Sequence, residues 1–294
     1  MSTTTPCASS PPPHASALVQ PEDVDLATCI CVDASWYLGQ PEGTGRARYA
    51  QEHIPGARFF DLDAVSDRSS DLPHMLPFNE PFEQAVGALG ITPADCLVIY
   101  DQQGMFSAPR VWWTFKAFGH ADVVVLDGGL PAWKRARRPT TAEPTPIKPT
   151  TYRAAFQPEM LTDFRSVYNK LVDFTSPRPD QIIDARPAAR FQGKAPEPRP
   201  GLASGHVPTA VNVPFGELLD PATGGFLPAD RLAARLSAAG IDLTRPVVTM
   251  CGSGVTAAVI YLALWELGKR DELALYDGSW AEWGRRKEAP VAAP

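Results

Sequence analysis

The feature that most constrains the fold of this chain is an internal repeat, in which the second half echoes the first at a shift of about 150 residues. Leu89–Gly90–Ile91 matches Ala239–Gly240–Ile241, and Asp127–Gly128 matches Asp277–Gly278. Two further matches pair His53–Ile54–Pro55 with His206–Val207–Pro208 and Asp33–Ala34 with Asp184–Ala185. Because the period is as long as a domain, the sequence predicts two copies of one domain and not a short-period solenoid.

Each copy alternates strand-like and helix-like segments. Short apolar, β-branched runs predict strands at 28–32, 97–100 and 123–126 in the first copy, and at 181–184, 247–250 and 273–276 in the second. Strands that alternate with helical segments indicate parallel sheets covered by helices. The predicted fold class is therefore α/β, with two tandem domains that each consist of a parallel sheet flanked by helices. Ligands of such sheets bind at the carboxyl ends of the strands.

The 294 residues suit two medium-sized domains. We place the first domain at 18–138 and the second at 159–289. Residues 139–158 are rich in Thr and Pro with little periodicity, and we interpret them as a linker. Residues 1–17 are rich in Ser, Thr, Pro and Ala and predict a disordered tail. This tail has neither the basic start and apolar stretch of a secretory signal nor the arginines of a mitochondrial transit peptide.

Composition excludes several classes of function. A net charge of −6 argues against a nucleic-acid partner, and the absence of an 18-residue apolar run argues against a membrane span. Five cysteines form an odd, irregularly spaced set, which suits a reducing compartment better than a disulfide framework. Cys29 and Cys31 share one face of a predicted strand and are interpreted as buried. We expect the cytoplasm, with the mitochondrion as the alternative, and no metal site, because no Cys/His cluster has the required spacing.

Cys251 occupies the most informative position in the chain. It ends the apolar run Pro246–Met250 and opens a six-residue loop, 251–256, before a strongly helical segment at 257–267. Free backbone N–H groups and the positive end of a helix dipole converge at such a position, and they favour the thiolate, which is the reactive form of cysteine. The alternative is a buried structural cysteine. Core packing, however, does not require the Gly252–Ser253–Gly254 sequence beside it.

The segment Cys251–Gly252–Ser253–Gly254–Val255–Thr256–Ala257 resembles the active loop of the 3-mercaptopyruvate sulfurtransferases, within the rhodanese superfamily. Rhodaneses that use thiosulfate usually carry basic residues directly after the cysteine, whereas Gly252 and Ser253 are uncharged. Rhodanese-like phosphatases need a loop one residue longer that ends in arginine, and Ala257 stands at the candidate position here. The resemblance covers nearly the whole chain, from about residue 18 to residue 285.

The resemblance implies a sulfurtransferase reaction. The Cys251 thiolate would take the sulfur of 3-mercaptopyruvate as a persulfide and release pyruvate, without a metal or organic cofactor. A thiol acceptor such as thioredoxin or a small thiol, or cyanide in an assay, would then remove the outer sulfur. Ping-pong kinetics are expected. No nucleic acid or membrane takes part in this reaction.

The resemblance also assigns site residues. Cys251, Ser253, His74 and Asp63 match the catalytic set, with Ser253–His74–Asp63 as a hydroxyl–imidazole–carboxylate relay. Arg190 and Arg199 match the two arginines that hold the substrate, a task for which the forked guanidinium is suited. We expect Arg186 to pair with a structural carboxylate, with substrate binding as the alternative. The remaining substrate-binding assignments are the loop residues Gly252, Gly254, Val255 and Thr256.

The equivalent of Cys251 in the first domain is Asp101, which cannot carry sulfur between substrates. We therefore interpret the loop of the first domain as non-catalytic. Two rival functions stay open on the sequence. One is thiosulfate sulfurtransferase activity, and the other is a non-enzymatic persulfide carrier module that kept the loop but lacks turnover.

Overall fold

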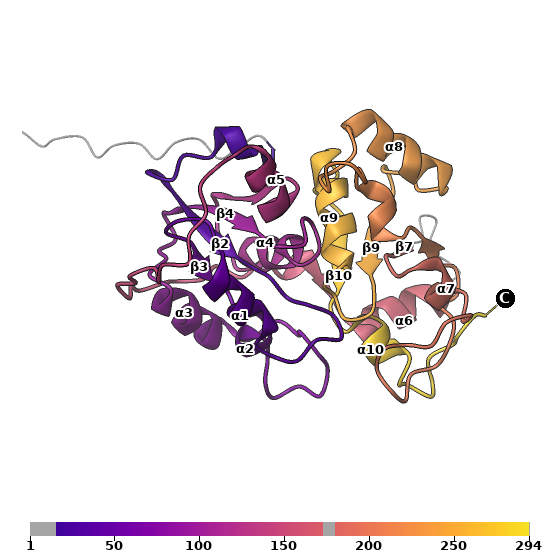
Figure 1. Cartoon of the computed structure of the whole chain (residues 1–294). Coiled ribbons are helices and arrows are strands. Elements are labelled where there is room, and N and C mark those ends of the chain that lie inside the picture. The colour runs from indigo at the N-terminus through magenta and orange to yellow at the C-terminus, as the bar shows by residue number, and fades with distance from the viewer. Residues whose placement is uncertain (1–15, 173–179, 294) are drawn as a thin grey trace, which may run out of the picture.

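The computed structural model of the protein describes residues 16–172 and 180–293, so most of the predicted tail at 1–17 lies outside the described residues. Figure 1 shows two lobes, the first in indigo to magenta and the second in orange to yellow. Each lobe contains a five-stranded sheet, with the strand orders β1-β5-β4-β2-β3 and β6-β10-β9-β7-β8. All neighbouring strands run parallel, and the two orders are equivalent. The predicted fold class is confirmed.

The first domain has strands β1 (Leu18–Val19), β2 (Cys29–Asp33), β3 (Arg58–Phe59), β4 (Cys96–Tyr100) and β5 (Val123–Leu126). Its helices are the short 3-10 helix η1 (Pro21–Asp23), then α1 (Thr44–Gln51), α2 (Leu62–Val65), α3 (Asn79–Ala88), α4 (Ala108–Ala117) and α5 (Gly129–Arg135). Strand β4 illustrates why the sheet forms. Leu97 and Ile99 enter the apolar cluster on one face, and Val98 and Tyr100 enter the cluster on the other. A central strand buried on both faces reads as a continuous apolar run.

The second domain has strands β6 (Leu161–Thr162), β7 (Gln181–Asp184), β8 (Val211–Asn212), β9 (Val247–Met250) and β10 (Leu273–Tyr276). Its α-helices are α6 (Phe164–Val172), α7 (Ala188–Phe191), α8 (Ala229–Ala238), α9 (Ala257–Glu266) and α10 (Ser279–Trp283). Two 3-10 helices, η2 (Pro158–Met160) and η3 (Phe215–Leu218), complete it. Within the described ranges, none of the helices has both the length and the apolar character needed to cross a bilayer.

The two domains pack through equivalent helices. Helix α4 follows the loop of Asp101, α9 follows the loop of Cys251, and the two helices lie against each other between the lobes (Figure 1). Trp112 of α4 meets Trp265 of α9 with ring centroids 5.6 Å apart. All residues from Ala257 to Leu264 are buried, as expected for a helix that is apolar on every side. One apolar cluster runs through both domains, so the interface is packed like a core.

The predicted linker lies against the first domain. Between α5 and η2 the chain forms no helix or strand, but His53 and Thr141 form an isolated antiparallel bridge. Further along, the Thr150 N–H donates to the Gly87 carbonyl over 2.8 Å, and Tyr152 is 2% exposed. These contacts fix the path of the segment over the domain surface.

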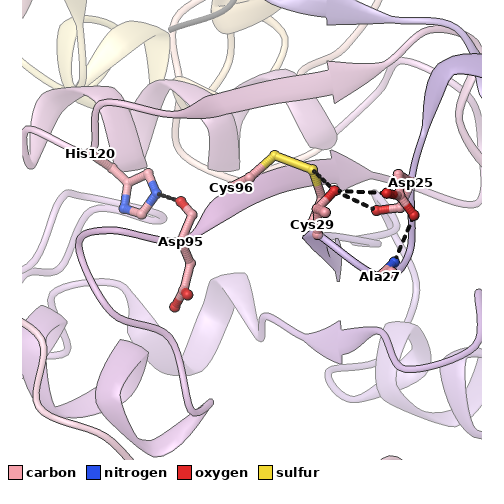
Figure 2. Close-up of a disulfide and its surroundings, with 7 residues drawn as sticks. Asp25, Ala27, Cys29, Asp95, Cys96 and His120 are labelled. Carbon is pink, nitrogen blue, oxygen red and sulfur yellow. Dashed lines mark hydrogen bonds between the residues drawn. A yellow bond between two sulfur atoms is a disulfide. The ribbon is translucent and has the colours of Figure 1, made fainter. Parts of the chain in front are cut away.

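One expectation about the cysteines is wrong. Cys29 is paired with Cys96 in a disulfide, whereas we interpreted Cys29 as a buried thiol (Figure 2). The reason is register: β2 and β4 are neighbours, and Cys29 stands directly opposite Cys96 at a Cα–Cα distance of 4.6 Å, within the usual range for disulfides. Sequence spacing alone does not show which strands are neighbours. Cys31 is a buried free thiol, and burial raises its pKa to about 12.

Candidate active site

Cys251 lies directly after β9 and six residues before the start of α9, at the carboxyl edge of the second sheet. Its side chain is 2% exposed. The loop from Cys251 to Thr256 turns back on itself through Gly254, whose φ of 77° lies in the left-handed region that favours glycine. Cys251 is therefore buried inside its loop and does not lie on an open surface.

The hydroxyl of Ser279 supports this loop from behind. The N–H groups of Cys251 and Gly254 each donate to Ser279 Oγ over 3.1 Å, and Ser279 Oγ donates to the Tyr276 carbonyl over 2.8 Å. The first residues of α10 add two backbone hydrogen bonds, from Trp280 N–H to the Cys251 carbonyl and from Ala281 N–H to the Gly252 carbonyl. The shape of the loop is thus fixed by β10 and α10. Sequence reasoning missed Ser279.

Other N–H groups of the loop are left free. Within the described part of the chain, no protein acceptor takes the backbone N–H groups of five residues around the cysteine: Gly252, Ser253, Val255, Thr256 and Ala257. Buried N–H groups are rarely left unpaired in folded proteins. Together with the N-terminus of the ten-residue helix α9, they form a cradle suited to an anionic sulfur.

The first domain contains a filled version of the same cradle. Asp101 follows β4 as Cys251 follows β9, and one oxygen of its carboxylate, Oδ2, accepts hydrogen bonds of 2.8–2.9 Å from the N–H groups of Phe106, Ser107 and Ala108. The other oxygen accepts from Gln103 N–H over 2.8 Å. The carboxylate thus occupies the place of an anion in the first domain. No sulfur chemistry is available there, and Asp101 instead holds its own loop closed.

The structure brings together Ser253, His74 and Asp63. His74 Nδ1 lies 3.1 Å from Ser253 Oγ, and His74 Nε2 lies 3.2 Å from Asp63 Oδ1. Ser253 comes from the second domain, while His74 and Asp63 come from the first. The side chains of Ser253 and His74 are each 5% exposed, so the contact between them is shielded from water.

The protonation of His74 follows from its surroundings. Burial, its largest influence, lowers the pKa of His74 from the usual 6.5; Arg110 and Arg199 lower it further, and Asp63 raises it. The ring is therefore neutral at pH 7. A neutral ring that donates from Nε2 to the Asp63 carboxylate must accept at Nδ1 from the Ser253 hydroxyl. His74 is thus ready to receive a proton from the direction of Cys251.

Arg190 and Arg199 lie on the same side of the loop. Arg190 Nη2 lies only 3.0 Å from the position that a Cβ atom on Gly252 would have. Arg190 is held by Glu197, which accepts from its Nε over 3.2 Å and from its Nη2. Arg199 makes no hydrogen bond or ion pair within the described residues. Burial lowers the pKa of Arg199, and the charge of Cys251 opposes that effect.

Arg186 has a different environment. Its Nε and Nη2 atoms donate to the Asp184 carboxylate over 2.7–3.1 Å, Nη1 donates to Glu197 over 2.7 Å, and its guanidinium stacks on Trp280. All of these groups are buried. Arg186 therefore has the pairing with a structural carboxylate that we expected, and through Glu197 it supports Arg190.

A cleft of about 480 Å³ opens beside Asp63, His74 and Arg199. The first domain contributes Trp36, Asp63 and His74 to its lining, and the second contributes Arg199 and Arg285. Trp36, which sequence reasoning missed, donates from Nε1 to both oxygens of Asp63 over 3.1 Å and sets its ring edge-on to His74. The cleft therefore exists only where the two domains meet.

Comparisons with known proteins show which family the chain resembles. The rhodanese-like domain family matches residues 40–136 and 168–286. The chain is 43% identical over 253 residues to the 3-mercaptopyruvate sulfurtransferase of Escherichia coli K12, covering 86% of this chain and 88% of the relative. It is 40% identical over 281 residues to the mitochondrial thiosulfate/3-mercaptopyruvate sulfurtransferase 1 of Arabidopsis thaliana, covering 88% and 73%. The crystal structure of SseA from Escherichia coli, a 3-mercaptopyruvate sulfotransferase, superposes with a TM-score of 0.80 at 39% identity, covering 90% of this chain and 99% of that one.

Proposed function

The chain belongs to the rhodanese family as an enzyme of the 3-mercaptopyruvate sulfurtransferase type, and from this premise we propose how its residues transfer sulfur. Cys251 is the sulfur carrier, and 3-mercaptopyruvate is the donor. The observation that carries the proposal is the set of free N–H groups around Cys251, because the equivalent groups in the first domain already hold an anion, the Asp101 carboxylate.

In the first half-reaction, the Cys251 thiolate attacks the sulfur of 3-mercaptopyruvate. A sulfur–sulfur bond forms while the carbon–sulfur bond of the substrate breaks, and its electron pair passes to the carbon as the enolate of pyruvate. Arg190 and Arg199 hold the carboxylate and keto oxygen and stabilise the enolate charge. The free N–H groups stabilise the persulfide that remains on Cys251.

Proton transfer in this step involves Ser253, His74 and Asp63. As the substrate thiol loses its proton to Ser253 Oγ, the serine hydroxyl passes its own proton to His74 Nδ1, 3.1 Å away. The Asp63 carboxylate stabilises the imidazolium that forms. Return of this proton to the enolate carbon yields pyruvate and restores the neutral ring, so the proton count closes.

In the second half-reaction, an acceptor thiolate attacks the outer sulfur of the persulfide. The new sulfur–sulfur bond leaves a persulfide on the acceptor and returns Cys251 as the thiolate. Thioredoxin and small thiols are the proposed acceptors, and cyanide can replace them in an assay. The open cleft beside His74 and Arg199 is the route that an acceptor would take. We propose the cytoplasm as the compartment of this reaction, with the mitochondrion as the alternative.

Thiosulfate is a second candidate donor. The relatives named thiosulfate/3-mercaptopyruvate sulfurtransferase 1 and 2 from Arabidopsis thaliana carry both donors in their names, at 40% and 41% identity to this chain. The uncharged residues Gly252 and Ser253 argue against thiosulfate as the better donor here, since a dianion favours cations beside the cysteine.

The test measures pyruvate release from 3-mercaptopyruvate with a thiol acceptor, beside thiocyanate formation from thiosulfate and cyanide. Both assays are run on the wild type and on Cys251→Ser. We expect 3-mercaptopyruvate to be strongly preferred and the variant to be inactive with both donors. A preference for thiosulfate would overturn the proposed donor, and activity in Cys251→Ser would overturn the proposed carrier.

A further inference from the structure

An ion pair buried between the domains lies directly behind the site, and the reaction proposed above gives it no role. We propose that this pair, Arg110 with Asp277, is a positioning device that holds the His74 loop and the Cys251 loop in register across the interface. The inference rests on the proposed function, because it concerns the contact between His74 and Ser253.

The two partners come from different domains. Arg110 stands in the first turn of α4, and Asp277 follows β10 directly. Their side chains are 1% and 2% exposed, and Arg110 Nη1 lies 2.6 Å from Asp277 Oδ1. The pair therefore joins the domains at a point shielded from water, where electrostatic interactions are strong.

Both partners contact the His74 loop. Arg110 Nη2 donates to the carbonyl of His74, and Asp277 Oδ2 accepts from the N–H of Leu76 over 2.7 Å. His74 has a φ of 61°, in the left-handed region that is uncommon for residues other than glycine. Such a conformation persists only where its surroundings dictate it. The two hydrogen bonds on either side of Met75 supply that constraint.

The same pair contacts the Cys251 loop. Arg110 Nη1 donates to the Gly254 carbonyl over 3.3 Å. A Cβ atom on Gly254 would lie 2.6 Å from Arg110 Nη1 and 3.1 Å from Asp277 Oδ1, so the ion pair lies directly against this glycine. Gly254 is the neighbour of Ser253. One guanidinium therefore contacts the chain on both sides of the 3.1 Å contact between His74 and Ser253.

Stability alone gives a weak reason for this pair. Buried ion pairs can often be replaced by apolar residues of similar volume at no loss of stability, because desolvation offsets the attraction. The geometry gives a stronger reason. The separate Nη atoms of arginine reach the His74 carbonyl and the Gly254 carbonyl at once, whereas the single nitrogen of lysine cannot form the same fork. The requirement is thus for arginine and not for a positive charge alone.

The test is a double-mutant cycle between Arg110→Lys and Ser253→Ala, read as kcat and KM for pyruvate release from 3-mercaptopyruvate. We expect Arg110→Lys to lower kcat about 10- to 100-fold with little change in KM, as misplacement of a catalytic group does. In the Ser253→Ala background, where the contact with His74 is already gone, the same change should cost less than about 3-fold. Additive losses, or a wild-type kcat in Arg110→Lys, would overturn the positioning role.

A second variant separates positioning from folding. Arg110→Met combined with Asp277→Leu removes both charges, so no lone charge is left buried. We expect a melting temperature near that of the wild type together with the same loss of kcat; a wild-type kcat in this folded protein rejects the inference. If Ser253→Ala itself keeps full activity, the proton relay of the proposed function fails and the inference fails with it. If Ser253→Ala is impaired but the losses add, the inference alone fails.

Discussion

His74 Nδ1 lies 3.1 Å from Ser253 Oγ, although 179 residues separate them and they belong to different domains. The cysteine loop and the proposed proton acceptor, His74, are thus brought together only when the two domains dock. The first domain therefore contributes to the site, although its own loop carries Asp101 in place of a cysteine. It supplies His74, Asp63 and one wall of the cleft.

The first prediction concerns His74. In His74→Asn the left-handed backbone is kept, because asparagine tolerates positive φ, but the proton acceptor is lost. We expect kcat for pyruvate release to fall by about 10²- to 10⁴-fold, the usual contribution of general acid–base catalysis. The matched control is His53→Asn, since His53 is also buried and its ring bonds to the Tyr49 carbonyl, outside the cleft. An unchanged kcat in His74→Asn would remove this residue from the proton relay.

The second prediction is the pH dependence. Because burial, the largest influence, and the nearby Arg110 and Arg199 lower the pKa of His74 while Asp63 raises it, the neutral ring persists below pH 6.5 in the folded protein. We expect kcat/KM to decline only on the acid side of pH 6.5, as the ring of the free enzyme takes up a proton. An apparent pKa above 6.5 for this decline would contradict the role of neutral His74.

Stability should follow the same group. Between the lowered pKa of His74 and pH 6.5, the unfolded chain binds more protons than the folded one. The free energy of unfolding therefore rises with pH in this window, and the contribution of His74 to stability is lost as the pH falls through it. The difference in unfolding free energy between wild type and His74→Asn should therefore decrease below pH 6.5. The lowered pKa of His120 is common to both proteins and cancels from this difference.

Much of the fold could be predicted from the sequence, for an identifiable reason. The repeat and the apolar runs specify parallel strands locally, and the residues that follow β4 and β9 then fall at the carboxyl edges of the sheets. The Cys29–Cys96 disulfide could not be predicted in this way, because it depends on which strands are neighbours. Strand order is set by long-range packing.

Some residues of the site could be predicted from the sequence, and others could not. Cys251, Ser253 and the glycines beside them form one continuous motif, which can be identified from the sequence alone. Ser279 supports the Cys251 loop, and Trp36 supports Asp63. Each lies more than 25 residues from its partner, and neither belongs to a recognisable motif. Asp277–Gly278 was visible as part of the repeat, but its contact with Arg110 arises only from docking of the domains.

The third prediction contrasts two arginines. Arg199 has no partner among the described residues, so Arg199→Ala should leave stability nearly unchanged and raise KM for 3-mercaptopyruvate about 10- to 100-fold, since hydrogen bonds to charged groups contribute about 1.5–3 kcal/mol. Arg186→Ala should instead reduce the free energy of unfolding by about 3–5 kcal/mol, because it leaves Asp184 buried without its cation and removes one of the two arginines that pair with Glu197. Urea unfolding and steady-state kinetics measure both effects. An intact KM in Arg199→Ala would contradict its assignment to the substrate carboxylate.

The fourth prediction concerns the disulfide. Cys29 and Cys96 lie 67 residues apart at the amino ends of β2 and β4, at the opposite edge of the sheet from the active site. Cys29→Ser combined with Cys96→Ser should lower the free energy of unfolding by about 2–4 kcal/mol and leave kcat of the folded enzyme unchanged. Peptide mapping without reductant should recover the linked peptides from the wild type. Free thiols at both positions in that map would contradict the pairing.

The last prediction concerns the choice of donor at Ser253. Gly252 lies against the guanidinium of Arg190, so a second cation at position 252 would be repelled, whereas the side chain of Ser253 contacts the neutral ring of His74. Ser253→Lys places a positive charge two residues after Cys251 and removes the hydroxyl that contacts His74. We expect pyruvate release from 3-mercaptopyruvate to fall, because the proton relay is cut, and thiocyanate formation from thiosulfate to rise, because the dianion gains a cation. Ser253→Met has a similar length and no charge, so it should lose the first activity without gaining the second. Equal thiosulfate activity in the lysine and methionine variants would show that charge beside the cysteine does not select the donor.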